Sequence, residues 1–277
     1  MNMLEASPPE DAGSQPRWPN LSRSGVVRQL TAWIAQDRPR AVVRFGEGEG
    51  RLLCAEPKDP DSMAVARRKL WRQTGRTYGD SDILAIKDMI LRALDEADVV
   101  GIRGSAGFDA EHLMWVRRIE QVFAARCQAG RRAGYVTHCL VSNDIFEALP
   151  AMLQDQKVVS VVSCRDVQAF VAQTYGVQHV RQFQIPSQYV KRHVDDAFEA
   201  GLHGTPMWPD FYRRLYDEVT VRERGEVFLV GAGLFGKDLC VRIRDLGGIA
   251  IDLGSRLDAM AGKVTRGEDR QRPSPAT

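Results

Sequence analysis

Residues Ala41-Val42-Val43-Arg44-Phe45 form a short apolar run, and Gly46-Glu47-Gly48-Glu49-Gly50 follow it directly. The run has the length and the β-branched side chains that are typical of a strand. Glycines let the backbone turn tightly and come close to a ligand. The two segments together predict a strand that ends in an acidic, glycine-rich turn.

Six more runs of this kind follow, separated by longer stretches with helical periodicity. Such alternation indicates βαβ units, so we expect a Rossmann-like α/β fold with a doubly wound, mostly parallel sheet of about seven strands. The expected strands are Ala41–Phe45, Val99–Ile102, Gly134–Thr137, Val158–Val162, Val180–Gln184, Val227–Val230 and Ile249–Asp252.

Helices are expected between the strands. The periodicity predicts Ser62–Gln73, Ser81–Ala97, Ala110–Ala129, Ser142–Leu153, Asp166–Tyr175, Pro209–Arg222 and Gly236–Leu246, with Asp109 and Ser142 as N-caps. Residues 190–209 have weak periodicity and are expected to be partly helical. We divide the chain into an N-terminal arm with a first helix at 1–38, a single catalytic domain at 39–267 and a disordered tail at 268–277.

Composition narrows the function classes. The 277 residues include 38 Lys and Arg against 36 Asp and Glu, a net charge of +2, so nothing indicates a nucleic-acid partner. The N-terminus lacks the basic and apolar regions of a signal peptide, and no apolar run approaches the roughly 20 residues of a membrane span. Five scattered cysteines indicate reduced thiols, and we expect a cytoplasmic protein. Peripheral membrane contact and a homo-oligomer stay open.

The carboxyl ends of parallel strands share one edge of a sheet, where helix N-termini favour anions. Glu47 and Glu49 come directly after the first expected strand. Hard cations such as Mn²⁺ and Mg²⁺ prefer carboxylate oxygens, so the two glutamates are candidate metal ligands. A solvated acidic turn is the alternative interpretation of the same residues.

Other expected strands also end in polar residues. Paired Arg103 and Arg165 would suit a diphosphate, which arginine binds through charge-assisted hydrogen bonds; ordinary salt bridges are the alternative. His138 is a candidate general base or positioning group. Ser163 either contacts the ligand or caps the next helix, and Ser187 follows the fifth strand.

A further motif, Gly231-Ala232-Gly233-Leu234-Phe235-Gly236, follows the sixth expected strand and opens a helix. With Asp252 about 20 residues downstream, it matches the fingerprint of dinucleotide-binding proteins, which predicts an NAD-dependent oxidoreductase as a rival function. Its position near the end of the chain leaves little sequence for the rest of such a domain. The glycines could instead serve close packing or bind a mononucleotide.

Two blocks resemble a known family. Val43 to Glu49 resembles the R-F-G-D-G-E signature of GT-D-type glycosyltransferases, and Val230 to Lys237, with Gly247 to Gly254 and Asp258, resembles that family's C-terminal block. The resemblance implies a metal-assisted transfer from a nucleotide sugar, commonly a UDP-sugar, to an acceptor in bacterial glycan biosynthesis. The family's D-x-E falls on Glu47, Gly48 and Glu49. Glu47 stands where the family has Asp, which puts its direct contact with a metal in doubt.

On this hypothesis a divalent metal held by Glu47 and Glu49 screens the departing diphosphate. The residues expected to bind the nucleotide sugar are Arg44, Gly46, Gly48, Arg103, Ser163, Arg165, Gly231, Gly233 and Gly236. Asp252, Asp258, Asp166 and His138 are candidate general bases, and the sequence does not choose among them. A non-catalytic nucleotide-binding module is a third possibility, beside the transferase and the oxidoreductase.

Overall fold

The computed structural model describes residues 20–102, 110–128, 134–187 and 197–263. They contain one sheet of seven parallel strands. Its strands are β1 (Arg40–Phe45), β2 (Val99–Ile102), β3 (Tyr135–His138), β4 (Val158–Ser163), β5 (His179–Gln184), β6 (Val227–Gly231) and β7 (Ile249–Asp252). The predicted α/β class and seven-stranded parallel sheet are confirmed.

The strand order is β3-β2-β1-β7-β6-β4-β5, so the last two strands of the chain enter the middle of the sheet. Strand β1 pairs with β2 on one side and with β7 on the other, and Val42 lies opposite both Val99 and Ile251. Strands β6 and β7 also pair in parallel. The turns after β1, β6 and β7 therefore leave the same edge close to one another.

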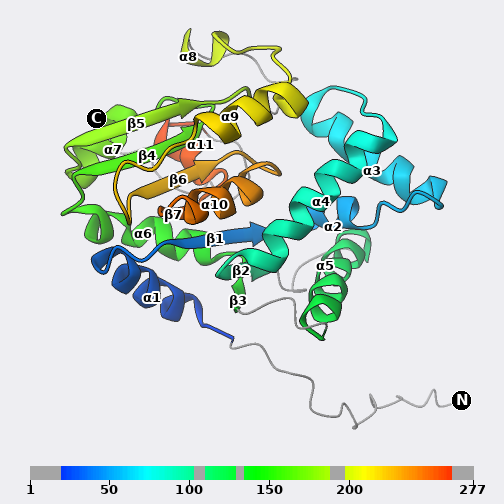
Figure 1. The fold of residues 1–277 in the computed structure, drawn as a ribbon, viewed down its shortest axis with the longest axis horizontal. Helices are drawn as coiled ribbons and strands as arrows, with labels where there is room; N and C mark the ends of the chain where they lie inside the picture. The colour runs from blue at the N-terminus through cyan, green and yellow to red at the C-terminus, as the bar shows by residue number, and fades with distance from the viewer. Residues whose placement is uncertain (1–19, 103–109, 129–133, 188–196, 264–277) are drawn as a thin grey trace, which may run out of the picture.

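Helices cover both faces of the sheet (Figure 1). One layer contains α2 (Glu47–Leu53), α3 (Pro60–Thr74), α4 (Asp80–Glu96), α5 (Ala110–Gln128), α9 (Tyr212–Glu218) and α10 (Gly236–Asp245). The other contains α1 (Arg23–Ala35), α6 (Val141–Leu153), α7 (Gln168–Tyr175) and α11 (Arg256–Met260). A short helix α8 (Ala197–Ala200) and a kinked segment η1 (Met207–Phe211), in which Trp208 is not helical, lie between β5 and α9.

Side chains of alternate strand residues pack into two hydrophobic cores, one on each face of the sheet. Val43 and Val100 belong to the core beneath α4 and α10, whereas Val42, Val99 and Ile251 belong to the core beneath α1 and α6. Both faces of a parallel sheet are covered, which explains why the strand sequences read as continuous apolar runs.

Several helix predictions need correction. The turn after β1 is itself the start of a helix, α2, which the glycine-rich sequence did not indicate. Helix α7 begins at Gln168, not at Asp166, and the predicted helix Pro209–Arg222 ends earlier than expected, at Glu218 of α9. It follows a kink at Trp208, whose backbone is not helical. In the predicted partly helical stretch 190–209, residues 190–196 lie outside the described residues, and α8 and the start of η1 fall in the remainder.

Both serine caps are also wrong. Ser142 lies inside α6, whose N-cap is Leu140. The Oγ of Ser142 accepts a hydrogen bond from Arg44 Nη1 at 2.9 Å and does not cap the helix. Ser163 Oγ accepts from the backbone N–H of Arg165, and the N-cap of α7 is Val167. The third expected cap, Asp109, lies outside the described residues.

No helix in the described parts of the chain is long and apolar enough to span a membrane. Within the described residues, Cys54, Cys139, Cys164 and Cys240 form no disulfide.

Candidate active site

Gly46 directly follows β1 and forms the N-cap of α2. Its backbone N–H donates to Oε2 of Glu49 at 2.9 Å, so the glutamate closes the first turn from within the helix. The helix then packs closely on α5, since a Cβ on Gly50 would stand 2.2 Å from the carbonyl oxygen of Trp115. Packing and this cap hold a helix that seven residues with two glycines would not form alone.

The other carboxylate oxygen of Glu49 faces Lys237 from α10, with Oε1 2.9 Å from Nζ. The same ammonium lies 3.2 Å from Oδ2 of Asp252 at the end of β7, and it donates to the carbonyl oxygen of Gly233 at 2.9 Å. All three side chains are buried. We call Glu49, Lys237 and Asp252 the buried triad.

Arg44 ties β1 to β7 beside the triad. Its Nε donates to the carbonyl oxygen of Asp252 at 3.1 Å, and its Nη2 lies 3.9 Å from Oδ1 of the same residue. Gly254 leaves room for the guanidinium, because a Cβ there would stand 2.0 Å from Nη2. Arg44 thus holds the ends of two central strands together.

The charged groups of the triad shift one another's pKa values. Burial by itself raises the pKa of the Glu49 carboxyl. The charge and hydrogen bond of Lys237 and the hydrogen bond from the Gly46 N–H together lower it by more, so the pKa lies below its ordinary 4.5. Burial lowers the pKa of the Lys237 ammonium, but the charges of Asp252 and Glu49 outweigh it and leave the pKa above 10.5. Both groups are charged at neutral pH.

The triad does not fit a divalent metal in this arrangement. The position between the Glu49 and Asp252 carboxylates, where a cation would bind, holds the Lys237 ammonium. Within the described ranges, no three His, Cys, Asp or Glu side chains gather to hold a metal ion. Glu47, the other expected ligand, is half-buried in the first turn of α2. Metal assistance stays a prediction.

The glycines of the second motif serve turn and packing geometry. Gly233 has φ 54°, a left-handed conformation that favours glycine. A Cβ on Gly231 would stand 2.7 Å from Leu257 Cδ1, and one on Gly236 would stand 3.2 Å from Val230 Cγ1. Gly231 and Gly236 therefore allow helices α11 and α10 to approach β6.

Arg165, expected to bind a diphosphate, is buried between two carboxylates. Its Nη1 donates to Glu199 and its Nε lies 3.0 Å from Oδ1 of Asp258. The arrangement therefore favours the salt-bridge alternative, here in a buried form. It also engages Asp258, one of the candidate general bases. A second candidate, Asp166, is exposed and accepts from the N–H of Gln168.

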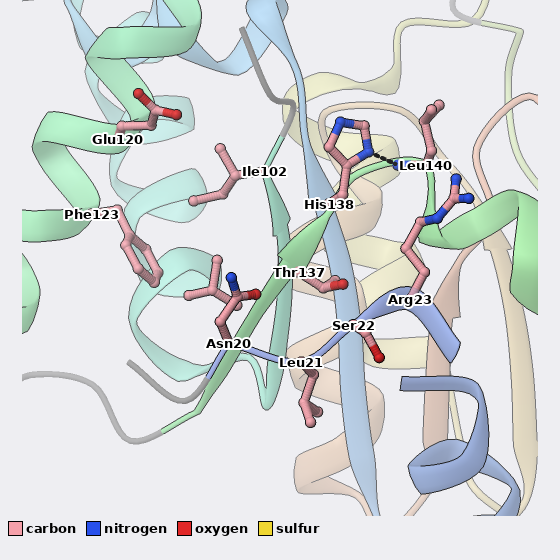
Figure 2. A pocket seen from close by; sticks show the side chains of 11 residues that line it. Asn20, Leu21, Ser22, Arg23, Ile102, Glu120, Phe123, Thr137, His138 and Leu140 are labelled. Atoms are coloured by element: carbon pink, nitrogen blue, oxygen red, sulfur yellow. Dashed lines mark hydrogen bonds between the residues drawn. The ribbon is translucent and has the colours of Figure 1, made fainter. Parts of the chain in front are cut away.

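His138 lies on the same sheet edge but at the outer strand β3, three strands away from β7. Its Nδ1 accepts from the N–H of Leu140 at 3.1 Å. Figure 2 shows it beside Arg23 and Leu140, at a pocket of about 700 Å³ that Glu120 and Phe123 close from α5. This pocket is separate from the buried triad.

Two other expected site residues lie elsewhere. Ser187, after β5, lines a pocket of about 250 Å³ together with Arg76 and Thr205. Arg103 lies outside the described residues. The structure thus brings together Arg44, Gly46, Glu49, Gly233 and Asp252, and it adds Lys237, which sequence reasoning missed. Its signal was present in the sequence, because the lysine directly follows the last glycine of the G-x-G-x-x-G motif.

A family model described as a GT-D fold-like domain matches residues 21–192, more than half of the chain. The chain belongs to the GT-D-like family. This assignment includes the Gly46 turn and most of the sheet. It confirms the family resemblance and the predicted enzyme class, a glycosyltransferase.

Solved structures place this GT-D-like chain among proteins with the same fold. It is similar to a domain of unknown function 1792 described as having a distinct glycosyltransferase fold, at 14% identity and a TM-score of 0.52, over 90% of this chain and 84% of that one. A selenomethionine-substituted structure of the same domain gives 13% identity, a TM-score of 0.51 and the same coverage. A glycosyltransferase from Streptococcus sanguinis shares 14% identity, with a TM-score of 0.47 over 92% of this chain and 93% of that one. No curated protein matches the chain.

Proposed function

We propose that this GT-D-like glycosyltransferase transfers a sugar from a nucleotide sugar, foremost a UDP-sugar, to a hydroxyl of a glycan acceptor. The observation that carries the proposal is the buried triad. Through Lys237 it joins the acidic turn after β1 to the glycine turn after β6 at the centre of the carboxyl edge. In open α/β sheets this edge is where nucleotides bind.

Glycosyl transfer needs the departing diphosphate stabilised while the anomeric carbon gains oxocarbenium character. Groups that are already fixed before the reaction stabilise such charge best. The triad and Arg44 hold the two turns in fixed positions and provide this rigidity. Their charges cancel, since two carboxylates face two cations. The positive charge that meets the diphosphate must therefore come from another group.

A divalent metal is one source of that charge, and it stays part of the proposal as a prediction. Glu47 is the other expected metal ligand, and it is not part of the triad. The matching experiment measures transfer before and after thorough chelation, and then after adding Mn²⁺ or Mg²⁺. Loss and recovery of transfer would support a metal, whereas full activity after chelation would remove it from the mechanism.

The rival functions fit the geometry less well. In a dinucleotide enzyme the acidic residue after the G-x-G-x-x-G motif binds a ribose hydroxyl, but Asp252 is buried against Lys237 and Arg44. A non-catalytic binding module would bind nucleotide without turnover. A thermal-shift screen of UDP-sugars, GDP-sugars and NAD(H) separates these functions, because a bound ligand raises the melting temperature.

The decisive variant is Glu49→Gln, which keeps the size of the side chain and removes its charge. We expect about a 100-fold to 1,000-fold loss of transfer, as for removal of a comparable electrostatic group. Glu218→Gln, an exposed change on α9, is the matched control and should transfer normally. Equal activity of Glu49→Gln and the wild type would refute a role for the triad in transfer.

A further inference from the structure

Helix α3 brings Lys69 over the first turn of α2. A Cβ on Gly48 would stand 2.6 Å from Lys69 Cε and 2.8 Å from its Nζ. The lysine therefore occupies the space in which any other residue at position 48 would place its side chain. This space lies between Glu47 and Glu49, the two acidic residues of the first motif.

Lys69 differs from Lys237 in how its charge is used. The Lys237 ammonium has three acceptors around it, on Glu49, Asp252 and Gly233. Lys69, by contrast, forms no hydrogen bond or ion pair within the part of the chain that the structure describes. Its charge does reach Glu49, where it contributes to the lowered pKa of the carboxyl. Glu49 itself is already paired through both oxygens.

Gly48 lies inside α2, where a glycine lowers the stability of the helix. Glycine destabilises a helix interior by up to about 1 kcal/mol relative to alanine. The atoms that a Cβ at this position would meet all belong to Lys69. The glycine is therefore explained by the need to leave the lysine in place.

We propose that Lys69 is the cation that contacts the diphosphate of the donor, and that Gly48 is the positioning residue that lets it reach the site. This inference rests on the proposed function. A half-buried ammonium with three donors and no protein acceptor binds phosphate oxygens as a point charge. The triad and Arg44 together carry no net charge, because two carboxylates face two cations, so they leave the charge of Lys69 uncompensated.

The two residues make linked predictions. Lys69→Met removes the charge, and we expect at least a tenfold weaker affinity for UDP, measured by calorimetry. Gly48→Ala leaves the charge but displaces the ammonium, so it should weaken UDP binding to a similar extent. The fold should survive, because the atoms that must move are the far end of a flexible side chain. Lys69→Arg should keep part of the affinity.

The double variant tests whether both act through the same group. If Gly48→Ala works by moving Lys69, it should cost nothing more in the Lys69→Met background, so the double variant should match Lys69→Met within about twofold. Arg68→Met, an exposed cation on the same helix, is the control for net charge and should bind UDP normally.

Three results would overturn the inference. Wild-type affinity for UDP in Lys69→Met would show that the lysine does not bind the diphosphate. Effects of the two substitutions that multiply in the double variant would show that Gly48 acts independently of Lys69. If the wild-type protein binds none of UDP, GDP and dTDP, the proposed function fails and this inference fails with it.

Discussion

The ammonium nitrogen of Lys237 lies 2.9 Å from Oε1 of Glu49, although the two residues belong to opposite ends of the sequence. Glu49 stands on the helix after β1 and Lys237 on the helix after β6. Their contact joins the two motifs that carry the family resemblance.

Lys237→Met should strongly destabilise the fold. It leaves the Glu49 and Asp252 carboxylates buried side by side without their shared cation, and breaking a buried ion pair costs about 3–5 kcal/mol. Urea unfolding measures the loss, with the exposed Lys58→Met as the control. Adding Glu49→Gln to Lys237→Met should restore part of the stability. A double variant less stable than Lys237→Met alone would contradict this account.

Acid should weaken the triad through Glu49. A carboxyl with a lowered pKa contributes stability that is complete above its ordinary pKa of 4.5 and is lost as the pH falls through its folded-state value. The wild type should therefore lose more stability than Glu49→Gln between pH 7 and pH 3.5, measured by urea unfolding. The pKa of Lys237 is raised, so its contribution is complete below its ordinary pKa of 10.5 and is lost only as the pH rises through the higher folded-state value. Parallel acid losses in both proteins would argue against the pair.

Gly254→Ala should cost more stability than Gly176→Ala. Both glycines have positive φ, 55° and 70°. Each alanine substitution should therefore lower the free energy of unfolding by about 1–2 kcal/mol, because alanine is strained in a left-handed backbone. Nothing lies within 4 Å of a Cβ at Gly176, whereas at Gly254 it would stand 2.0 Å from Nη2 of Arg44. The extra loss at Gly254 measures what Arg44 contributes by bridging β1 and β7. Equal losses in thermal unfolding would mean that the arginine moves aside freely.

Arg165→Met should affect stability and not ligand binding. It removes the cation buried between Glu199 and Asp258, so the folded state should be destabilised by a few kcal/mol. The affinity of the remaining folded protein for UDP should stay within about twofold of the wild type. Weak UDP binding by a stable variant would instead support the original hypothesis that Arg165 binds the diphosphate.

The sequence by itself determined the sheet and the edge on which to look for a site. Short β-branched runs such as Val227–Val230 are apolar on both sides, which only a buried parallel strand needs, and this local property is visible without the fold. Because parallel strands end at one edge, the turns after Phe45 and Val230 were expected to open on the same side.

The tertiary structure alone decided which charged groups meet. Lys237 pairs with Glu49 because β6 and β7 insert beside β1, and a strand order of this kind is not contained in any local pattern. The same holds for Arg165, whose partner Glu199 comes from a separate short helix. Helix α2 forms because packing against α5 compensates for its glycines. Long-range packing outweighs local propensity at these positions, and the chemistry of the site depends on the resulting contacts.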